Sequence, residues 1–447
     1  MARSRVWPLV TICLGYFMVI LDTTVVNVAL PSIERQLGAT VAGLQWVVDG
    51  YALVFASLLL TAGALGDRLG SKRVFLGGFV LFTVTSALCG TAPTLGALVA
   101  FRVAQGVGAA LLVPASLALL RHTFADPVGR ARAIGLWGAI AGIAAGGGPV
   151  LGGVLVAALG WRSVFLVNVP IGLLGVLLTL RFVAPSPPLP RRGLDLAAQV
   201  AGIVALGLLT FAFIEGAASG WWSPPILGAC GLCAIAAAAF MATERRATSP
   251  MLPPGLFSSP TFSAGTAVGL LINFGFYGQL FLLSLFFQQV RGYSALATGV
   301  ALLPETGVVA LSSFLSGHLT GRVGPRLPMA IGLAAGGVGL LALVLVGPKT
   351  AYPAIAAMLS AVGFGMAFTM PAMTAAVVEE APHEHAGITA AVLNASRQVG
   401  GVLGVALLGA FVSRHNSFVP GMHVALLIAG GAFLVGCVLT LLAVRRG

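Results

Sequence analysis

Four ionisable residues stand inside long apolar runs of the sequence, where they could bind or transfer a proton. Asp22 lies in GYFMVILDTTVVNVALP, Asp49 and Arg102 lie in two further apolar runs, and Glu305 lies in LLPETGVVAL. A charged side chain at the centre of a bilayer costs roughly 2.5 to 3.5 kcal/mol on insertion scales, so it normally faces a polar cavity, an ionic partner or a proton pathway. We therefore expect proton-coupling sites at these four residues.

Each of the four has a specific expectation. Asp22, Asp49 and Arg102 fall at similar depths in their runs, so they are expected to share one network in which Arg102 controls proton binding. Glu305 is the single acid in the middle of an apolar run in the second half of the chain. Because desolvation favours the neutral form of a carboxyl group, Glu305 could hold a proton in one conformation. A structural ion pair with Arg397 is the alternative.

Composition places these residues in a membrane protein. The 447-residue chain is 58% hydrophobic and 8% charged, with mean hydropathy +1.03. Its apolar runs have the roughly 20-residue length of a membrane-spanning helix, which predicts an all-α integral membrane protein. The expected spans, fourteen in all, are 8–30, 42–65, 74–92, 95–120, 133–158, 164–183, 196–214, 224–242, 262–288, 296–317, 328–346, 352–376, 388–412 and 421–443.

Charge distribution sets the expected topology and excludes some partners. Most of the 24 Lys and Arg fall in alternate loops together with the amino terminus, which predicts that both termini are cytoplasmic. The net charge of +12 is not gathered into a patch that could follow phosphates, so no nucleic-acid partner is expected. The five cysteines lie in apolar runs and no P-loop is present, so neither a metal nor another cofactor is expected.

The two halves of the sequence resemble each other. Three pairs of segments match in the same order, which relates spans one to six to spans nine to fourteen. The pairs are 63–73 with 317–326, 108–114 with 365–371, and 148–152 with 400–404. The predicted domains are therefore a six-helix bundle at 1–183, a linker with two inserted helices at 184–257, and a second six-helix bundle at 258–447.

Four motifs carry a resemblance to a known family. They are LDTTVVNVALP, GALGDRLGSKR, RVAQGVGAA and GIAAGGGPVLGG, in that order. Over essentially the whole chain the sequence resembles the major facilitator superfamily, specifically the fourteen-span drug:proton antiporters of the EmrB/QacA group, and most of all the methylenomycin A resistance proteins. The resemblance implies two pseudo-symmetric six-helix bundles, alternating access and a site in the bacterial inner membrane.

Two motifs are expected to control conformation. In GALGDRLGSKR, Asp67 can pair with basic residues of a neighbouring loop and latch helix ends together. The latch residues are Gly63, Asp67, Arg68, Gly70 and Lys72. The second copy has Gly321 where an acid would stand, so only the first copy should form the latch. A solvated turn is the alternative.

The second motif is rich in small residues, which allow helices to approach closely in lipid. Its residues Gly148, Pro149, Gly152 and Gly153 match the family's antiporter motif, which implies a proton-tight interface between the halves. Generic helix packing would explain the glycines equally well.

Substrate contacts are expected from aromatic, methionine and amide side chains suited to adaptable apolar binding. The candidates are Asn273, Phe276, Tyr277, Gln279, Met366, Phe368, Met370, Asn394 and Arg397. The expected activity is export of a small amphiphilic drug or antibiotic, neutral or weakly charged, by a monomer driven by the proton gradient. The alternatives are a proton symporter that imports a metabolite, a membrane-embedded enzyme and a non-transporting sensor. The six histidines lie in loops or at helix ends, which disfavours an enzyme.

Overall fold

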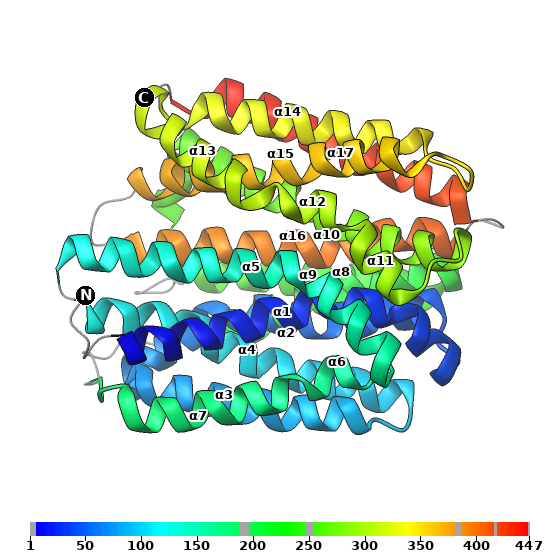
Figure 1. The fold of residues 1–447 in the computed structure, drawn as a ribbon. Coiled ribbons are helices and arrows are strands. Elements are labelled where there is room, and N and C mark those ends of the chain that lie inside the picture. The colour runs from blue at the N-terminus through cyan, green and yellow to red at the C-terminus, as the bar shows by residue number, and fades with distance from the viewer. Residues whose placement is uncertain are drawn as a thin grey trace.

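The computed structural model describes residues 6–124, 126–186, 196–246, 254–380, 386–414 and 418–445. These residues form fourteen helices, or chains of helices, that are long and apolar enough to cross a membrane, which confirms the predicted fold class. Figure 1 shows them as one elongated bundle in which α1 begins and α17 ends at the same end. We call this the terminus end and the opposite one the distal end.

The helices follow the order of the predicted spans. The first group comprises α1 (Val6–Leu37), α2 (Val41–Leu69), α3 (Ser71–Thr91), α4 (Leu95–Thr123), α5 (Pro127–Leu159), α6 (Ser163–Leu166) and α7 (Asn168–Phe182). Two inserted helices follow, α8 (Leu196–Ser219) and α9 (Pro224–Arg246). The second group comprises α10 (Pro260–Leu285), α11 (Ala295–Ala301), α12 (Leu303–Gly307), α13 (Val309–Val323), α14 (Arg326–Ala342), α15 (Tyr352–Glu379), α16 (Ala386–Arg414) and α17 (Phe418–Ala443). The short elements η2 (Pro254–Ser258) and η4 (Leu343–Leu345) are 3-10 helices, and η3 (Phe286–Val290) is a π-helical turn.

Two of the spans are broken where proline removes a backbone donor. Proline lacks the N–H that would bond one turn back along a helix. Span six divides into α6 and α7 ahead of Pro170, and span ten divides into α11, α12 and α13 around Pro304. The breaks place Asn168 at the start of α7 and Glu305 within the short α12. Both polar residues therefore lie at interruptions of otherwise apolar helices.

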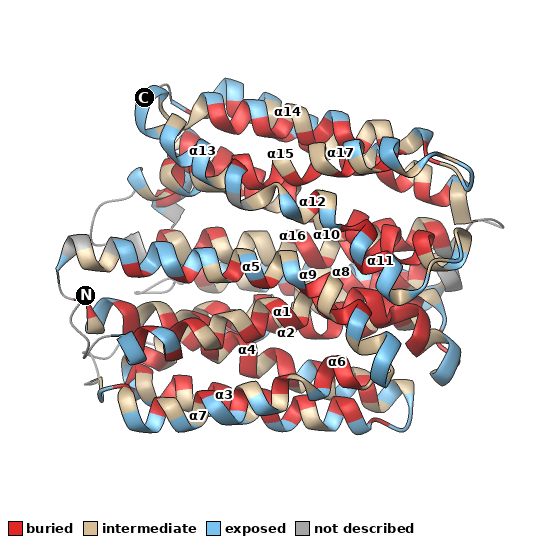
Figure 2. Cartoon of the chain, viewed as in Figure 1, coloured by how far each residue is buried: buried red, intermediate tan, exposed pale blue. Residues whose placement is uncertain are grey.

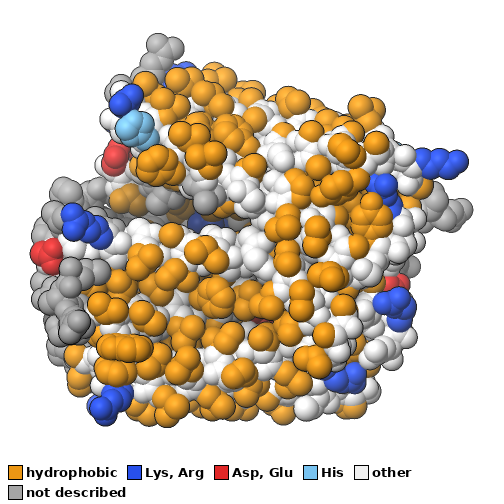
Figure 3. Space-filling view, in the orientation of Figure 1, with side chains coloured by type: hydrophobic (Ala, Val, Ile, Leu, Met, Phe, Trp, Pro, Cys, Tyr) orange, Lys and Arg blue, Asp and Glu red, His pale blue; other side chains and the backbone are white. Residues whose placement is uncertain are grey.

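The exterior of the bundle suits a lipid environment. Leu442, Leu345 and Phe314 are 80%, 78% and 73% exposed. Figure 2 shows such exposed positions on the outward faces of the helices, whereas buried residues line the faces that meet other helices. In Figure 3 hydrophobic side chains cover the flank, and most Lys and Arg lie at its two ends. This distribution is that of a multi-pass membrane protein.

The two helix groups join at the distal end and separate toward the terminus end. One apolar core includes the distal residues Val25 and Leu30 of α1 together with Phe281 and Leu408 of the second group. Gln45 of α2 also donates to the carbonyl oxygens of Val405 and Ala406 on α16, at 2.8 and 2.7 Å. Figure 3 shows the surface hollowed between the two groups on the side of the terminus end. On this face the hollow opens toward the terminus end.

The inserted helices are attached to the first group by polar contacts. Gln199 of α8 donates to the carbonyl oxygen of Ser57 at 2.6 Å and accepts a hydrogen bond from Thr61. Near the other end of α8, Glu215 accepts a hydrogen bond from the indole of Trp46 at 3.0 Å. A mostly apolar pocket of about 330 Å³ lies among α8, α9, α2 and α16. The inserted pair thus covers the seam between the groups.

Close helix contacts depend on particular glycines, and Gly106 on α4 offers a matched test. A Cβ at Gly106 would lie 2.5 Å from the carbonyl oxygen of Tyr51, whereas one at Gly96 on the same helix would meet nothing within 4 Å. We expect Gly106→Ala to destabilise the purified protein by about 1–3 kcal/mol, because the backbone of α2 cannot yield. Thermal unfolding in detergent should show a lower midpoint for Gly106→Ala than for the wild type. The midpoint of Gly96→Ala should equal that of the wild type. Equal midpoints for the two variants would contradict the packing.

Candidate functional site

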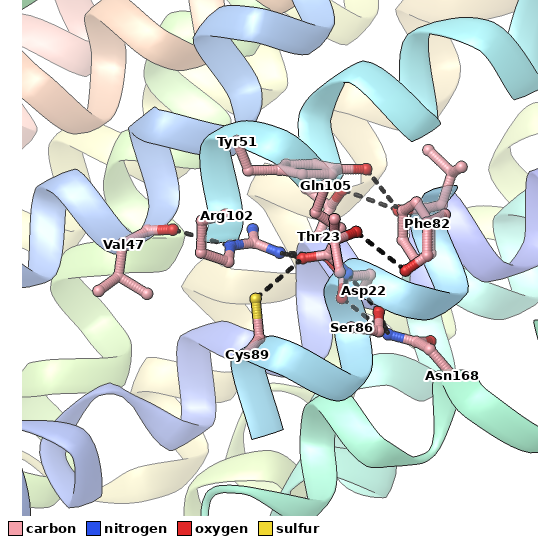
Figure 4. Close-up of polar contacts among 12 residues, drawn as sticks. Asp22, Thr23, Val47, Tyr51, Phe82, Ser86, Cys89, Arg102, Gln105 and Asn168 are labelled. Atoms are coloured by element: carbon pink, nitrogen blue, oxygen red, sulfur yellow. Dashed lines mark hydrogen bonds and ion pairs between the residues drawn. The ribbon is translucent and has the colours of Figure 1, made fainter. Parts of the chain in front are cut away.

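An ion pair is buried inside the first helix group. Asp22 on α1 and Arg102 on α4 are 0% and 1% exposed, and Arg102 Nη1 lies 2.5 Å from Asp22 Oδ2 (Figure 4). Arg102 Nε donates to the carbonyl oxygen of Val47 on α2 at 2.9 Å, and its guanidinium lies 4.2 Å from the ring centre of Tyr51. The prediction that Asp22 and Arg102 share one network is therefore confirmed.

Three neutral side chains complete the hydrogen bonding of this pair. Gln105 Nε2 and Asn168 Nδ2 donate to Asp22 Oδ1 at 3.0 and 2.8 Å. Gln105 also accepts from Arg102 at 2.7 Å and donates to the hydroxyl of Ser86 on α3 at 2.6 Å. We call Asp22, Ser86, Arg102, Gln105 and Asn168 the polar cluster. A buried ion pair is stable only when its remaining donors and acceptors are satisfied, and here Asp22 has three donors.

Sequence reasoning did not identify three members of the polar cluster. Gln105, Ser86 and Asn168 are neutral, so no charge marked them within their apolar spans. A signal was nevertheless present, because Gln105 follows Arg102 by three residues and so shares its helix face. Asn168 could have been found from Pro170, since an amide near a helix break is free to bond outside its own helix.

Asp49 does not belong to the polar cluster, and the expectation that it shares the network of Asp22 was wrong. Its side chain is fully buried on α2, and neither carboxyl oxygen has a hydrogen-bond partner. Gln45, one turn earlier on α2, bonds to α16 of the second group. Similar depth fixes position along a helix but not the face on which a side chain lies, and Asp49 forms no ion pair with Arg102.

Glu305 lies at the break in span ten. It is fully buried, accepts a hydrogen bond at Oε1 from Gln279 on α10, and has no partner at Oε2. The alternative expectation of an ion pair with Arg397 is not realised among the described residues. A Cβ at Gly363 on α15 would overlap the carbonyl oxygen of Glu305, so α15 packs directly on the backbone at this point.

The glycines of α5 form contacts on two sides. A Cβ at Gly148 would overlap the Thr24 side chain of α1, and one at Gly152 would lie 2.7 Å from the carbonyl oxygen of Val25. On the other side, a Cβ at Gly153 would lie 2.7 Å from the carbonyl oxygen of Ala295, and Gly299 on α11 packs against Pro149. The motif thus lies where the two helix groups touch.

No ion pair closes the expected latch among the residues that the structure describes. Gly70 makes the turn after α2 with φ of +87°, and the backbone N–H of Lys72 donates to Ser186 Oγ at 3.0 Å. Asp67 is half-buried and forms no ion pair with any described residue, and Arg68 is exposed. Gly63 packs against Pro114 of α4. Within the described residues Asp67 thus has no ionic partner, and its pairing with a neighbouring loop stays a prediction.

The substrate candidates divide into buried and half-buried residues. Asn273 donates to the carbonyl oxygen of Gly269 on its own helix at 2.9 Å. Met366 and Phe368 are 9% and 6% exposed, and Gln279 is occupied by Glu305, so these four are packed within the second group. The half-buried candidates are Phe276, Tyr277, Met370, Asn394 and Arg397.

Aromatic side chains that the sequence analysis did not single out add to the first group. Tyr16 of α1 and Trp137 of α5 stack with ring centres 3.8 Å apart and an interplanar angle of 7°. Tyr16 is half-buried, and Trp137 donates to the hydroxyl of Ser116 at 3.1 Å. Tyr277 and Arg397 of the second group lie near enough to Tyr16 to interact with it electrostatically.

The polar cluster generates a stability prediction. Asp22→Asn leaves the guanidinium of Arg102 buried without an anion, which should destabilise the protein by about 3–5 kcal/mol. The double variant Asp22→Asn, Arg102→Gln should lose less than the sum of the two single losses, because it removes both charges. Thermal unfolding of the four proteins measures the coupling. Glu34→Gln, which changes an acid on α1 at the distal end, is the control. Additive losses would show that the pair is not coupled.

The chain resembles known transport proteins over almost its whole length. The sequence model of the Major Facilitator Superfamily matches residues 12–405. A methylenomycin A resistance protein from Bacillus subtilis is 38% identical over 96% of this chain and 92% of that protein. The tetracenomycin C resistance and export protein of Streptomyces glaucescens is 37% identical over 92% of this chain and 77% of that protein. The multidrug resistance protein Stp of Mycobacterium tuberculosis is 39% identical over 92% of this chain and 77% of that protein.

A solved structure agrees with the fold. The inward-facing, unoccupied crystal structure of a bacterial homolog of the human lysosomal transporter Spinster has a TM-score of 0.69 and 18% sequence identity. The match covers 99% of this chain and 97% of that one. At this identity the likeness concerns the fold alone. Together with the sequence matches, it shows that this chain is a membrane transport protein of the major facilitator superfamily, not an enzyme.

Proposed function

We propose that this protein exports a small amphiphilic drug or antibiotic in exchange for protons. The observation that carries the proposal is near-full-length similarity to relatives named for antibiotic resistance, export and multidrug efflux. Two of the expected proton-coupling residues, Asp49 and Glu305, support it because each is buried with at least one carboxyl oxygen unpartnered. An unpaired buried carboxyl group can bind a proton and release it when water or a cation reaches it.

The buried acids take different roles in this proposal. Asp22 has a cation and two amide donors, so its negative charge is stabilised in the present conformation. Asp49 and Glu305 lack a cation and are the proton carriers that we propose for this conformation. Arg102 would release Asp22 for protonation only if the polar cluster rearranges. Asp22 and Arg102 thus also take part in the proposed coupling. Asp22 would be protonated later in the cycle than Asp49 and Glu305.

Alternating access follows from the arrangement of the two helix groups. We propose that residues 1–183 and 258–447 move as two units about the distal contacts, with 184–257 as an inserted part. The terminus end would face the cytoplasm of a bacterial cell, and the hollow there would admit substrate. Closing that end would bring Asp67 and the residues Gly63, Arg68, Gly70 and Lys72 against the neighbouring helices, where the latch could form.

Proton movement coupled to drug addition tests the exchange. In inverted membrane vesicles energised by respiration, at least one compound of a panel that contains methylenomycin A, tetracenomycin C and puromycin, after which relatives are named, should cause protons to leave the acidified lumen. A fluorescent pH probe detects this proton movement. Glu305→Gln and Asp49→Asn should reduce this signal to that of vesicles without the protein, because neither variant can carry the proton. Glu34→Gln should retain it. Two results would refute the exchange. One is a proton signal that no added compound changes, and the other is a compound-driven signal that persists unchanged in both variants.

The contact at Gly153 tests the distal joint. Gly153→Leu should drive α5 away from α11, because its side chain would overlap Ala295. Spin labels at Thr91→Cys and Lys349→Cys, two exposed distal residues of the different groups, should then report a longer distance by pulsed electron paramagnetic resonance. Gly147→Leu, where a Cβ meets nothing within 4 Å, should leave the distance unchanged. An unchanged distance in Gly153→Leu would show that α5 and α11 do not set the distal joint.

A further inference from the structure

Arg397 is a cation in the middle of a span that no described acid neutralises. It lies on α16, where Lys and Arg are otherwise absent from the middle of the helix. The other mid-span cation, Arg102, is paired with Asp22. Neither Asp49 nor Glu305 makes an ion pair with Arg397 in the part of the chain that the structure describes. Such a charge is costly in an apolar bundle unless it faces a water-filled cavity or an anionic ligand.

The guanidinium of Arg397 is held in place but not saturated. Its aliphatic stem packs against α10, since a Cβ at Gly269 would lie 3.1 Å from Arg397 Cγ. Nη1 donates to Asn394 Oδ1 at 3.3 Å, a long hydrogen bond to a neutral group on the same helix. Nε is buried and has no hydrogen-bond partner. Among the described residues the guanidinium thus makes one long hydrogen bond, to a neutral acceptor, and no ion pair with an acid.

The Arg397 side chain is half-buried and lies near tyrosines of both helix groups. It interacts electrostatically with Tyr16 of α1, in the first group, and with Tyr277 of α10, in its own. The stack of Tyr16 on Trp137 and the edge-to-face pair of Phe276 and Tyr277, with ring centres 5.4 Å apart, bring aromatic surface to the same region. A positive charge that no described acid pairs with thus lies near aromatic side chains.

We infer that the transported compound carries a carboxylate, or a similar planar anionic group, on an apolar aromatic frame. Arginine binds carboxylates through paired N–H donors, and such charge-assisted hydrogen bonds are stronger than neutral ones. The aromatic side chains would hold the remainder of the compound. This inference rests on the proposed function, and it replaces the expectation of a neutral or weakly charged substrate with an anionic one.

A matched pair of fluorescent probes tests the charge preference. N-dansyl-phenylalanine and N-dansyl-phenylalaninamide differ only in that a carboxylate is replaced by a neutral amide. Titrated into the purified full-length protein in detergent, the acid should bind about tenfold or more tightly than the amide. Arg397→Gln should abolish the difference. Arg397→Lys should retain part of it, because an ammonium group keeps the charge but not the paired donors. Arg322→Gln, at an exposed residue of the terminus end, should retain all of it.

Each other outcome overturns the inference. Equal affinities in the wild type would exclude a carboxylate preference, and a preference that survives Arg397→Gln would place it elsewhere. Failure of both probes to bind would show that an aromatic carboxylate is not accepted. Size-exclusion chromatography and thermal unfolding of each variant would identify misfolding. Binding needs no proton gradient, so a carboxylate preference without drug-driven proton movement would uphold the role of Arg397 and refute proton exchange.

Discussion

A guanidinium group buried among apolar helices must have an anion beside it, and this requirement organises the first helix group. The polar cluster draws a side chain from α1, α3, α4 and α7 and a carbonyl group from α2 to one point. Loss of one charge from such a pair costs about 3–5 kcal/mol, which exceeds most single packing contacts. Five of the spans are thereby tied together, which supports the proposal that the first group moves as one unit.

The other two mid-span acids, Asp49 and Glu305, lie where the helix groups meet. Asp49 is on α2, the helix that bonds to α16 across the seam, and Glu305 is on the broken span whose outer segment packs against α5. In the exchange that we propose, a movement of one group against the other would change the surroundings of both carboxyl groups first. Protonation of Asp22 would require the polar cluster to rearrange as well.

The charge of the substrate determines how much the membrane potential contributes to its export. With the terminus end in the cytoplasm, inward proton transfer and outward transfer of an anion both move charge in the same electrical direction. Each elementary charge that crosses adds about 2.3 kcal/mol per 100 mV of membrane potential. An anionic compound would therefore be exported with help from the potential as well as from the proton gradient. A cationic compound would be expelled against the potential, and the uncompensated charge of Arg397 would oppose its binding.

The amino-acid sequence by itself determined the number, order and approximate bounds of the spans, because apolar length is a local property that the bilayer fixes. It also determined that Asp22 and Arg102 are buried at one depth, which their distances from the span ends encode. Only the tertiary structure decided which faces of the helices contact one another. It placed Asp49 outside the polar cluster, brought Gln105 and Asn168 into it, and left Arg397 without an acid. These outcomes depend on the rotation and packing of helices far apart in the chain, and hydropathy along one segment does not encode either.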